Sequence, residues 1–393
     1  MTRAKTGHAS TTSTARSEQM PPSTPPFRAE HVGSLLRPAT LKRARADLAA
    51  GRIDADELRA VEDAAVAAAV RLQEDVGLRC ATDGELRRDE WHMDFIYELE
   101  GISHVASERK ATWGSDTGTV VYEPPGMEYT GRIGIDHTIF GDAFAFLREQ
   151  VTTAVPKLTI PSPSMVHLSR AGGVFVGGVY GDDEAAFWDD VTAAYSAQIR
   201  RLGELGVTYL QIDDTSFGVL NDPAYRARIA ERGGDAAHLH ETYIENFNRA
   251  VADRPEGMTL GTHMCRGNFR SSWVAEGGYD FIAEALLTRL DVDAFFMEFD
   301  DERSGGFEPL RHVPPGKRVV LGLVTTKRPE LESKDELKRR IEQASRYVDI
   351  DQLCLSPQCG FSSTEEGNDL TEGEQTAKLR LVVETAEEVW GRR

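Results

Sequence analysis

The sequence has few cysteines, a deficit of basic residues and no long apolar run. Four cysteines in 393 residues are too few for a disulfide framework, so metal binding or burial is the expected role of these thiols. Lys and Arg total 45 against 64 Asp and Glu, and the resulting formal net charge of -19 excludes a basic surface that tracks phosphates. No apolar run approaches the roughly 20 residues that cross a bilayer. We therefore expect small-molecule partners, no nucleic acid and no membrane.

Residues 1–26 differ in composition from the rest of the chain. They are rich in Ser, Thr and Pro, contain almost nothing to bury, and lack the apolar centre of a secretory signal. The sequence therefore predicts a disordered tail over residues 1–26, a single folded domain over residues 27–393 and a cytoplasmic protein.

Eight short apolar segments follow the tail, and most of them precede a stretch with helical spacing. They are FRAEHVGS, LRCATDGE, KLTIPSPS, VTYLQIDD, MTLGTHMC, VDAFFMEFDD, RVVLGLVTTK and DQLCLSPQCG. Alternating strands and helices give a parallel sheet, and eight units close it, so the sequence predicts a (β/α)8 barrel of the α/β class. Chemistry on such a barrel lies at the carboxyl ends of the strands. The unusual polar residues fall at those ends: Ser34, Glu85, Asp213, His263, Cys265, Glu298 and Cys359.

One connection, over residues 101–150, is too long for an ordinary loop. It contains TVVYEPPGMEYTGRIGI, which predicts a β-hairpin inserted after the second strand, over the active-site face of the barrel. A decorative insertion and a lid or substrate-contact role are equally compatible with this pattern.

His263 and Cys265 stand two residues apart at the end of a predicted strand, so both side chains point to the same side. Alone the pair is weak evidence for a metal site, because a buried Cys beside a hydrogen-bonded His gives the same sequence pattern. Glu298 and Cys359 end later strands, and two thiolates, an imidazole and a carboxylate favour zinc over harder ions. Ligands from three separate strand ends favour catalysis, and a metal-stabilised scaffold is the non-enzymatic alternative.

Six motifs together resemble the catalytic barrel of cobalamin-independent methionine synthase and its short stand-alone relatives. They are HVGSLLRP, TDGELRRDE, YLQIDD, GTHMCRGN, FFMEFDDERSG and LCLSPQCGF, and the resemblance covers nearly all of the chain after the tail. It implies an amino-acid thiol pocket in which Glu85 and Asp213 hold the ammonium group and the backbone near Ser34 receives the carboxylate. It also implies zinc (Zn2+) ligands at His263, Cys265, Glu298 and Cys359.

The chain departs from that family at two places. The methionine synthases have Glu-Pro after the Asp that matches Asp213, whereas this chain has Asp214 and Thr215. They also have an Asp-x-His pair, associated with proton delivery to the leaving group, where this chain has Thr325 and Lys327. Lys327 is the candidate catalytic proton donor, and a solvated lysine is the plain alternative. The chain lacks the N-terminal barrel that helps the long synthases bind folate, so the donor stays open.

The sequence thus predicts zinc-dependent methyl or alkyl transfer to a thiol, by default homocysteine, with methionine as the product. Transfer to or from another thiol, as in the coenzyme M alkyltransferases, is the first alternative. A barrel lyase or decarboxylase is less favoured, because that chemistry needs clustered Arg or Lys and this site is acidic. The oligomeric state stays open, and a homo-oligomer is compatible with the sequence.

Overall fold

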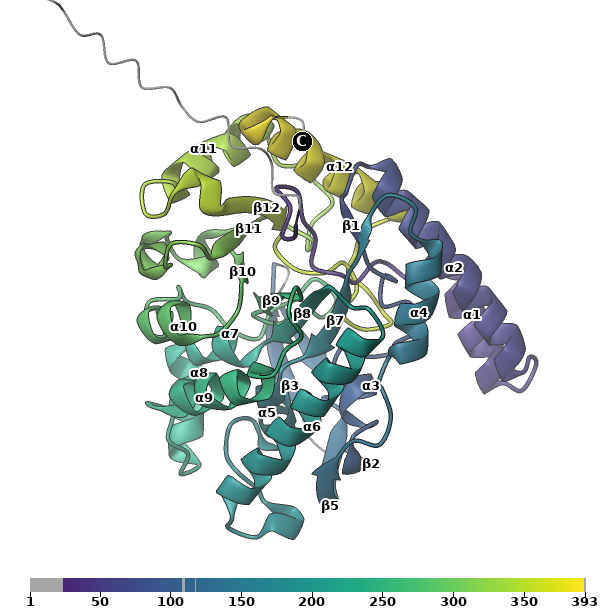
Figure 1. Cartoon of the computed structure of the whole chain (residues 1–393), viewed down its shortest axis with the longest axis vertical. Coiled ribbons are helices and arrows are strands. Elements are labelled where there is room, and N and C mark those ends of the chain that lie inside the picture. The colour runs from purple at the N-terminus through teal and green to yellow at the C-terminus, as the bar shows by residue number, and fades with distance from the viewer. Residues whose placement is uncertain (1–23, 108–109, 117, 392–393) are drawn as a thin grey trace, which may run out of the picture.

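The computed structural model describes residues 24–107, 110–116 and 118–391, so most of the expected tail lies outside the described residues. Six parallel strands form a sheet in the order β12-β11-β10-β9-β8-β7 (Figure 1). They are β7 (Leu158–Pro161), β8 (Tyr209–Asp214), β9 (Thr259–Met264), β10 (Ala294–Glu298), β11 (Arg318–Val324) and β12 (Leu353–Pro357).

Two short segments close this sheet into a barrel. β1 (Cys80–Ala81) pairs in parallel with β6 (Val155–Pro156), which leads directly into β7. Ala29 forms a parallel bridge with Leu355 of β12, and the N–H of Leu35 donates to a carbonyl just after β1 at 2.9 Å. Eight strand positions therefore surround the core, and the predicted (β/α)8 barrel is confirmed. The first position is joined by this bridge and the Leu35 hydrogen bond rather than by a full strand.

The helices lie outside the strands (Figure 1). In α2 the side chain of Asp54 accepts from the N–H of Glu57 at 2.9 Å while Glu57 accepts from the N–H of Asp54, a capping box that fixes where the helix begins. No helix within the described ranges is long and apolar enough to cross a membrane. The α-helices are α1 (Ala39–Ala49), α2 (Ala55–Asp75), α3 (Met93–Ile96), α4 (Gly141–Gln150), α5 (Pro163–Ala171), α6 (Glu184–Glu204), α7 (Ser216–Leu220), α8 (Pro223–Glu231), α9 (Leu239–Val251), α10 (Ala283–Arg289), α11 (Lys334–Ala344) and α12 (Glu372–Trp390).

Antiparallel strands occupy the first part of the long connection after β1, and α4 occupies its end. In β3, Gly114 exchanges two backbone hydrogen bonds of 2.8 Å with Trp273, in the segment after β9. Asp116, just after β3, pairs with Arg328 after β11 at 2.6 Å. The β3–β4 hairpin is therefore attached to the barrel at the carboxyl ends of its strands. The pairs are β2 (Glu100–Val105) with β5 (Gly126–Gly134) and β3 (Ala111–Ser115) with β4 (Gly118–Tyr122). The hairpin predicted from TVVYEPPGMEYTGRIGI is therefore wrong in its pairing, because β4 and β5, the two strands of that segment, each pair with an earlier strand of the insertion.

The barrel interior is filled by side chains. Cys80 and Cys354 are fully buried there, in a cluster with Tyr209 and Phe296. The ammonium of Lys157 lies 4.4 Å from the centre of the Phe296 ring. Two of the four cysteines are therefore core residues, and the other two remain for chemistry.

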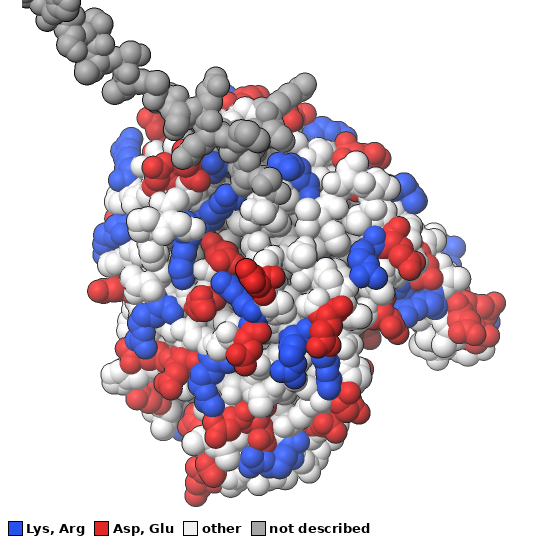
Figure 2. All heavy atoms as spheres, in the orientation of Figure 1, with Lys and Arg blue, Asp and Glu red and all other residues white. Residues whose placement is uncertain are grey.

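The molecular surface carries charges of both signs. On the face shown in Figure 2, acidic and basic side chains are interspersed.

Candidate functional site

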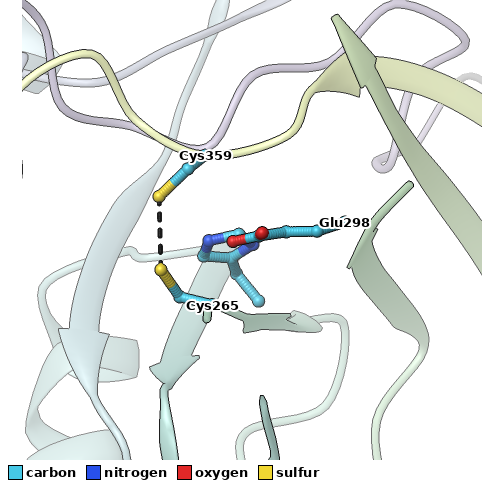
Figure 3. Close-up of side chains that lie close together, drawn as sticks. Cys265, Glu298 and Cys359 are labelled. Atoms are coloured by element: carbon cyan, nitrogen blue, oxygen red, sulfur yellow. Dashed lines mark hydrogen bonds between the residues drawn. The ribbon is translucent and has the colours of Figure 1, made fainter. Parts of the chain in front are cut away.

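The four proposed metal ligands meet at the carboxyl ends of β9, β10 and β12. One ligand atom from each of His263, Cys265, Glu298 and Cys359 lies within 4.8 Å of every other, and all four residues are buried. Met297 pairs with Met264 in the parallel register, which places Glu298 beside Cys265. Figure 3 shows the side chains of Cys265, Glu298 and Cys359 directed toward one another.

The four side chains fit a zinc ion. The Sγ atoms of Cys265 and Cys359 are 3.4 Å apart, near the separation of about 3.8 Å that follows from two tetrahedral Zn–S bonds of about 2.3 Å. Neither buried ring nitrogen of His263 has a well-formed hydrogen bond within the described part of the chain. Since a buried imidazole normally has a partner, these nitrogens indicate a missing ligand. Two sulfurs, one imidazole and one carboxylate are a zinc donor set.

The pKa values of the two thiols are shifted in opposite directions. A hydrogen bond from Cys265 lowers the pKa of Cys359 well below its ordinary value, against the effect of burial and with help from His263. The same hydrogen bond, together with burial, raises the pKa of Cys265 well above its ordinary value. Without any metal ion, the surrounding residues thus favour the thiolate form of Cys359. The thiolate is the form of cysteine that binds metal.

Arg266 and Tyr279 hold the carboxylate ligand in place. The backbone N–H of Arg266 donates to Oε1 of Glu298 at 3.1 Å, and the N–H of Glu298 donates to the Tyr279 hydroxyl at 2.9 Å. The Arg266 guanidinium donates to the same hydroxyl at 3.0 Å. Supporting contacts of this kind orient metal ligands. Sequence reasoning missed both residues, although Arg266 directly follows a ligand.

A cavity of about 670 Å³ opens beside the cluster. The β3–β4 hairpin covers part of it through Trp113 and Tyr122, whose rings are 4.8 Å apart. Phe269 lies 4.9 Å from Tyr122 and completes an aromatic wall, and neither Tyr122 nor Phe269 was singled out from the sequence. Six of the residues proposed from the sequence line this cavity: Ser34, Glu85, Asp213, His263, Cys265 and Cys359.

Two buried carboxylates line the cavity, and the guanidinium of Arg88 lies 3.9 Å from Oε1 of one of them, Glu85. Oε1 of Glu85 accepts from the Thr159 hydroxyl at 2.8 Å, and its Oε2 has no partner among the described residues. Oδ1 of Asp213 accepts from the Gln211 amide at 2.6 Å. Burial raises the pKa of Glu85, against the nearby Arg88, and raises the pKa of Asp213 to about 7. A cation arriving in the cavity would relieve the cost of this burial.

Asp214, the neighbour of Asp213, has a different environment. Its carboxylate accepts from the Ser164 hydroxyl at 2.7 Å, the Ser216 hydroxyl at 2.6 Å and the N–H of Phe217 at 3.1 Å. These three bonds join the end of β8 to α5 and α7. Asp214 is therefore a structural residue, while Asp213 stays open to the cavity.

Ser34 lies against the loop that carries Cys359. Its hydroxyl accepts from the N–H of Ser362 at 3.3 Å, and its carbonyl accepts from the N–H of Phe361 at 3.0 Å. A Cβ at Gly360 would lie 1.9 Å from the Ser34 hydroxyl, so only glycine allows this approach. The segment at Ser34 and the ligand loop are thus packed as one wall of the cavity.

Lys327 is buried beside the cluster rather than solvated. It is 5% exposed, and its Nζ has no hydrogen-bond partner among the described residues. Burial lowers its pKa, but the carboxylates of Glu298 and Asp300 outweigh burial, so the pKa is raised and the ammonium form is favoured. The described residues that line the cavity do not include Lys327.

The comparison with known families gives a match over most of the chain. Residues 27–388 match the catalytic domain of cobalamin-independent synthase. The chain belongs to this family. It is 45% identical over 367 residues to the uncharacterized protein YxjG of Bacillus subtilis, with 93% of this chain and 95% of that protein covered. It is 25% identical over 331 residues to a methionine synthase of Pyrococcus abyssi, with 84% and 85% covered.

Two solved structures have the same barrel. A putative vitamin-B12-independent methionine synthase from Listeria monocytogenes is 35% identical, with a TM-score of 0.73 over 93% of this chain and 99% of that chain. A B12-independent methionine synthase from Shewanella sp. W3-18-1, in complex with selenomethionine, is 19% identical, with a TM-score of 0.67 over 92% of this chain and 97% of that chain. The second likeness concerns the fold alone.

Proposed function

We propose that this protein is a zinc-dependent transferase that moves a methyl or alkyl group onto a thiol, by default homocysteine, with methionine as the product. The observation that carries the proposal is the four-ligand cluster, which opens into the same cavity as Glu85 and Asp213. Membership in the cobalamin-independent synthase family supports methyl transfer as the reaction class. A bound zinc would supply a thiolate at neutral pH by lowering the pKa of the acceptor thiol.

The chain's own residues would hold the amino-acid part of the acceptor. Glu85 and Asp213 are buried carboxylates that face the cavity, and they suit an ammonium group. The backbone near Ser34, on the wall beside the Cys359 loop, would receive the carboxylate. Together these contacts would fix the orientation of the thiol relative to the cluster, which raises the rate by positioning.

Lys327 is our candidate proton source for the group that leaves the donor. General-acid help of this kind is typically worth ~10²- to 10⁴-fold in rate. The raised pKa of Lys327 keeps this side chain in the ammonium form, which carries the proton but gives it up less readily than an ordinary lysine does. The same ammonium offsets the negative charge of Glu298 and the thiolates, a role that requires no contact with the donor.

X-ray absorption at the zinc edge tests the proposal. Adding homocysteine to the zinc-loaded protein should change the spectrum, with added sulfur scattering at about 2.3 Å. Glu85→Gln and Asp213→Asn should weaken this response by raising the concentration of homocysteine needed. A spectrum that no small thiol changes would refute thiol activation. Unchanged thiol affinity in both variants would refute the homocysteine assignment.

A further inference from the structure

The three rings of the aromatic wall form a concave surface rather than a flat slot. Trp113 and Tyr122 of the β3–β4 hairpin and Phe269 after β9 all line the cavity. Their ring centres lie 4.8 Å, 4.9 Å and 6.1 Å apart, and their planes are inclined to one another by 51°, 55° and 77°. Parallel rings suit a flat ligand, whereas inclined rings can surround a rounded cation. The wall therefore has the shape of a site for a compact, rounded group.

A carboxyl group lies at the edge of this wall. Oε2 of Glu90, which also lines the cavity, accepts from the Tyr122 hydroxyl at 3.5 Å. Within the described chain Glu90 forms no ion pair with Lys or Arg, and its nearest basic partner is His92, with Nδ1 at 4.0 Å. Burial lowers the pKa of His92 to about 3, so this ring is neutral. The protein thus leaves the charge of Glu90 without a cation in contact.

The surroundings of Glu90 favour the arrival of a cation. Burial, followed by the carboxylates of Glu366 and Asp94, raises the pKa of Glu90 to about 8. His92 is 8% exposed and lines the cavity, and its Nδ1 has no hydrogen-bond partner among the described residues. A positive ligand against the wall would offset the burial and the repulsion that Glu90 experiences.

The wall also stands next to the metal cluster. A Cβ at Gly267 would lie 2.9 Å from the ring of Trp113, so only glycine lets the ring approach this segment so closely. The N–H of Gly267 donates to Sγ of the ligand Cys265 at 3.2 Å. A group held against Trp113 is therefore at the end of the cavity where the acceptor thiol would bind.

We propose that Glu90, Trp113, Tyr122 and Phe269 form the subsite for the methyl or alkyl donor, and that this donor is an onium ion, either a sulfonium or a quaternary ammonium. The assignment to the donor rests on the proposed function, in which a thiol at the metal cluster is the acceptor. The aromatic faces attract the cation through their quadrupoles, and the carboxylate of Glu90 attracts it by charge.

Transfer from an onium ion requires no proton. The acceptor thiolate sulfur forms a bond to the methyl carbon, and the bond from that carbon to the positively charged sulfur or nitrogen breaks. The electron pair stays with the leaving atom, so a neutral thioether or tertiary amine departs and the charges of thiolate and onium ion cancel. Lys327 is not among the described residues that line the cavity. With a donor of this class, Lys327 would only offset the charge of Glu298 and the thiolates.

Ligand-observed NMR titration of the zinc-loaded protein with trimethylsulfonium and with tetramethylammonium tests the subsite. The ion that binds more tightly identifies the source as a sulfonium or an ammonium. tert-Butanol, a neutral molecule of similar shape, should bind about tenfold more weakly than that ion. Saturating homocysteine should not displace the ion, because donor and acceptor must occupy the cavity together.

Two substitutions test the wall and the carboxylate separately. Glu90→Gln and Tyr122→Leu should each weaken binding of the ion about tenfold. Tyr122→Phe keeps the ring and should retain most of the wild-type affinity, which guards against a folding defect. Glu149→Gln removes an exposed carboxylate of α4 that does not line the cavity, so this control for net charge should bind like the wild type.

The onium subsite would be overturned if the wild type bound neither ion, if tert-butanol bound as tightly as the ions, or if Glu90→Gln and Tyr122→Leu lost no more affinity than the control. Displacement of the ion by homocysteine would also overturn it, because the ion would then lie at Glu85 and Asp213. Zinc-edge spectra of the wild type with homocysteine test the proposed function separately. A thiol that stays out of the zinc shell would refute that function, while the titration still decides whether the wall binds an onium ion.

Discussion

Two groups of buried polar residues in this barrel can be compared, one in its interior and one at its mouth. In the interior, Glu30 accepts from the N–H of Phe27 at 2.8 Å and from the Cys80 thiol at 3.1 Å. Lys157 lies 3.5 Å from the same carboxylate and donates to the carbonyl of His31 at 2.6 Å. At the mouth, the ring nitrogens of His263, one oxygen of Glu85 and the ammonium of Lys327 have no hydrogen-bond partner among the described residues.

The difference concerns where unsatisfied groups lie: the ring nitrogens of His31 in the interior also have no hydrogen-bond partner among the described residues, whereas His263 and Glu85 line the cavity. A buried charge is tolerated when its neighbours satisfy it, as in the interior group, which then stabilises one packing of the core. Groups left unsatisfied beside a cavity store a free-energy cost that a bound metal or substrate removes. The interior group should therefore affect the free energy of unfolding, and the mouth group should affect binding and turnover.

The largest expected effect is on metal binding. Cys359→Ala removes a ligand, and because substitution of mere supporting residues costs 10- to 100-fold in metal affinity, we expect a loss greater than about 100-fold. Zinc content by mass spectrometry after dialysis measures it. Cys354→Ala is the matched control, because Cys354 is equally buried but lies in the core of β12. A Cys359 variant that keeps a full equivalent of zinc would remove this residue from the site.

The next effect concerns the interior group. Lys157→Met leaves Glu30 buried without its cation, and breaking a buried pair typically costs about 3–5 kcal/mol in the free energy of unfolding. Urea unfolding measures the change, and zinc content should stay at one equivalent. Lys334→Met, which breaks two surface ion pairs between α11 and α12, should cost less than about 1 kcal/mol. Equal effects of the two substitutions would contradict the structural role of the interior pair.

The adjacent residues Asp213 and Asp214 give the same contrast between a residue that affects binding and one that affects the free energy of unfolding. Asp214→Asn disturbs a carboxylate that accepts three hydrogen bonds, and we expect a loss of about 2 kcal/mol in unfolding free energy. Asp213→Asn should leave unfolding nearly unchanged and weaken methionine binding by about tenfold. Urea unfolding and calorimetry of both variants separate these outcomes. If the two variants behave alike, the distinction between the residues fails.

The smallest effect is a pH dependence of ligand binding. Burial raises the pKa of Asp213 to about 7, so below that pH the carboxyl group is protonated and must lose its proton to hold an ammonium group. Affinity for methionine, which has no thiol to ionise, should fall as the pH drops below 7 and level off at a total loss of no more than about tenfold, because the protonated carboxyl is as neutral as the Asn side chain. Calorimetry from pH 5.5 to about pH 8 measures the slope. Asp213→Asn should flatten it, and an unchanged slope would assign the proton to another group.

The sequence alone determined the barrel and the residues at its mouth. Alternating apolar strands and helical stretches predict a parallel sheet, and their number, eight, favours a closed one. The two-residue period of a strand puts His263 and Cys265 on one side. Because parallel strands all end at the same rim, residues as distant as Ser34 and Cys359 were expected there before any contact was known.

Only the tertiary structure decided which polar residues are satisfied and which remain open. Asp213 and Asp214 are the same residue type at adjacent positions, and serine hydroxyls from α5 and α7 make the second one structural. The charged state of the buried Lys327 likewise depends on the carboxylates of Glu298 and Asp300, which approach it from another strand end. These outcomes depend on donors and charges that other segments bring through space, and no local pattern in the sequence records them.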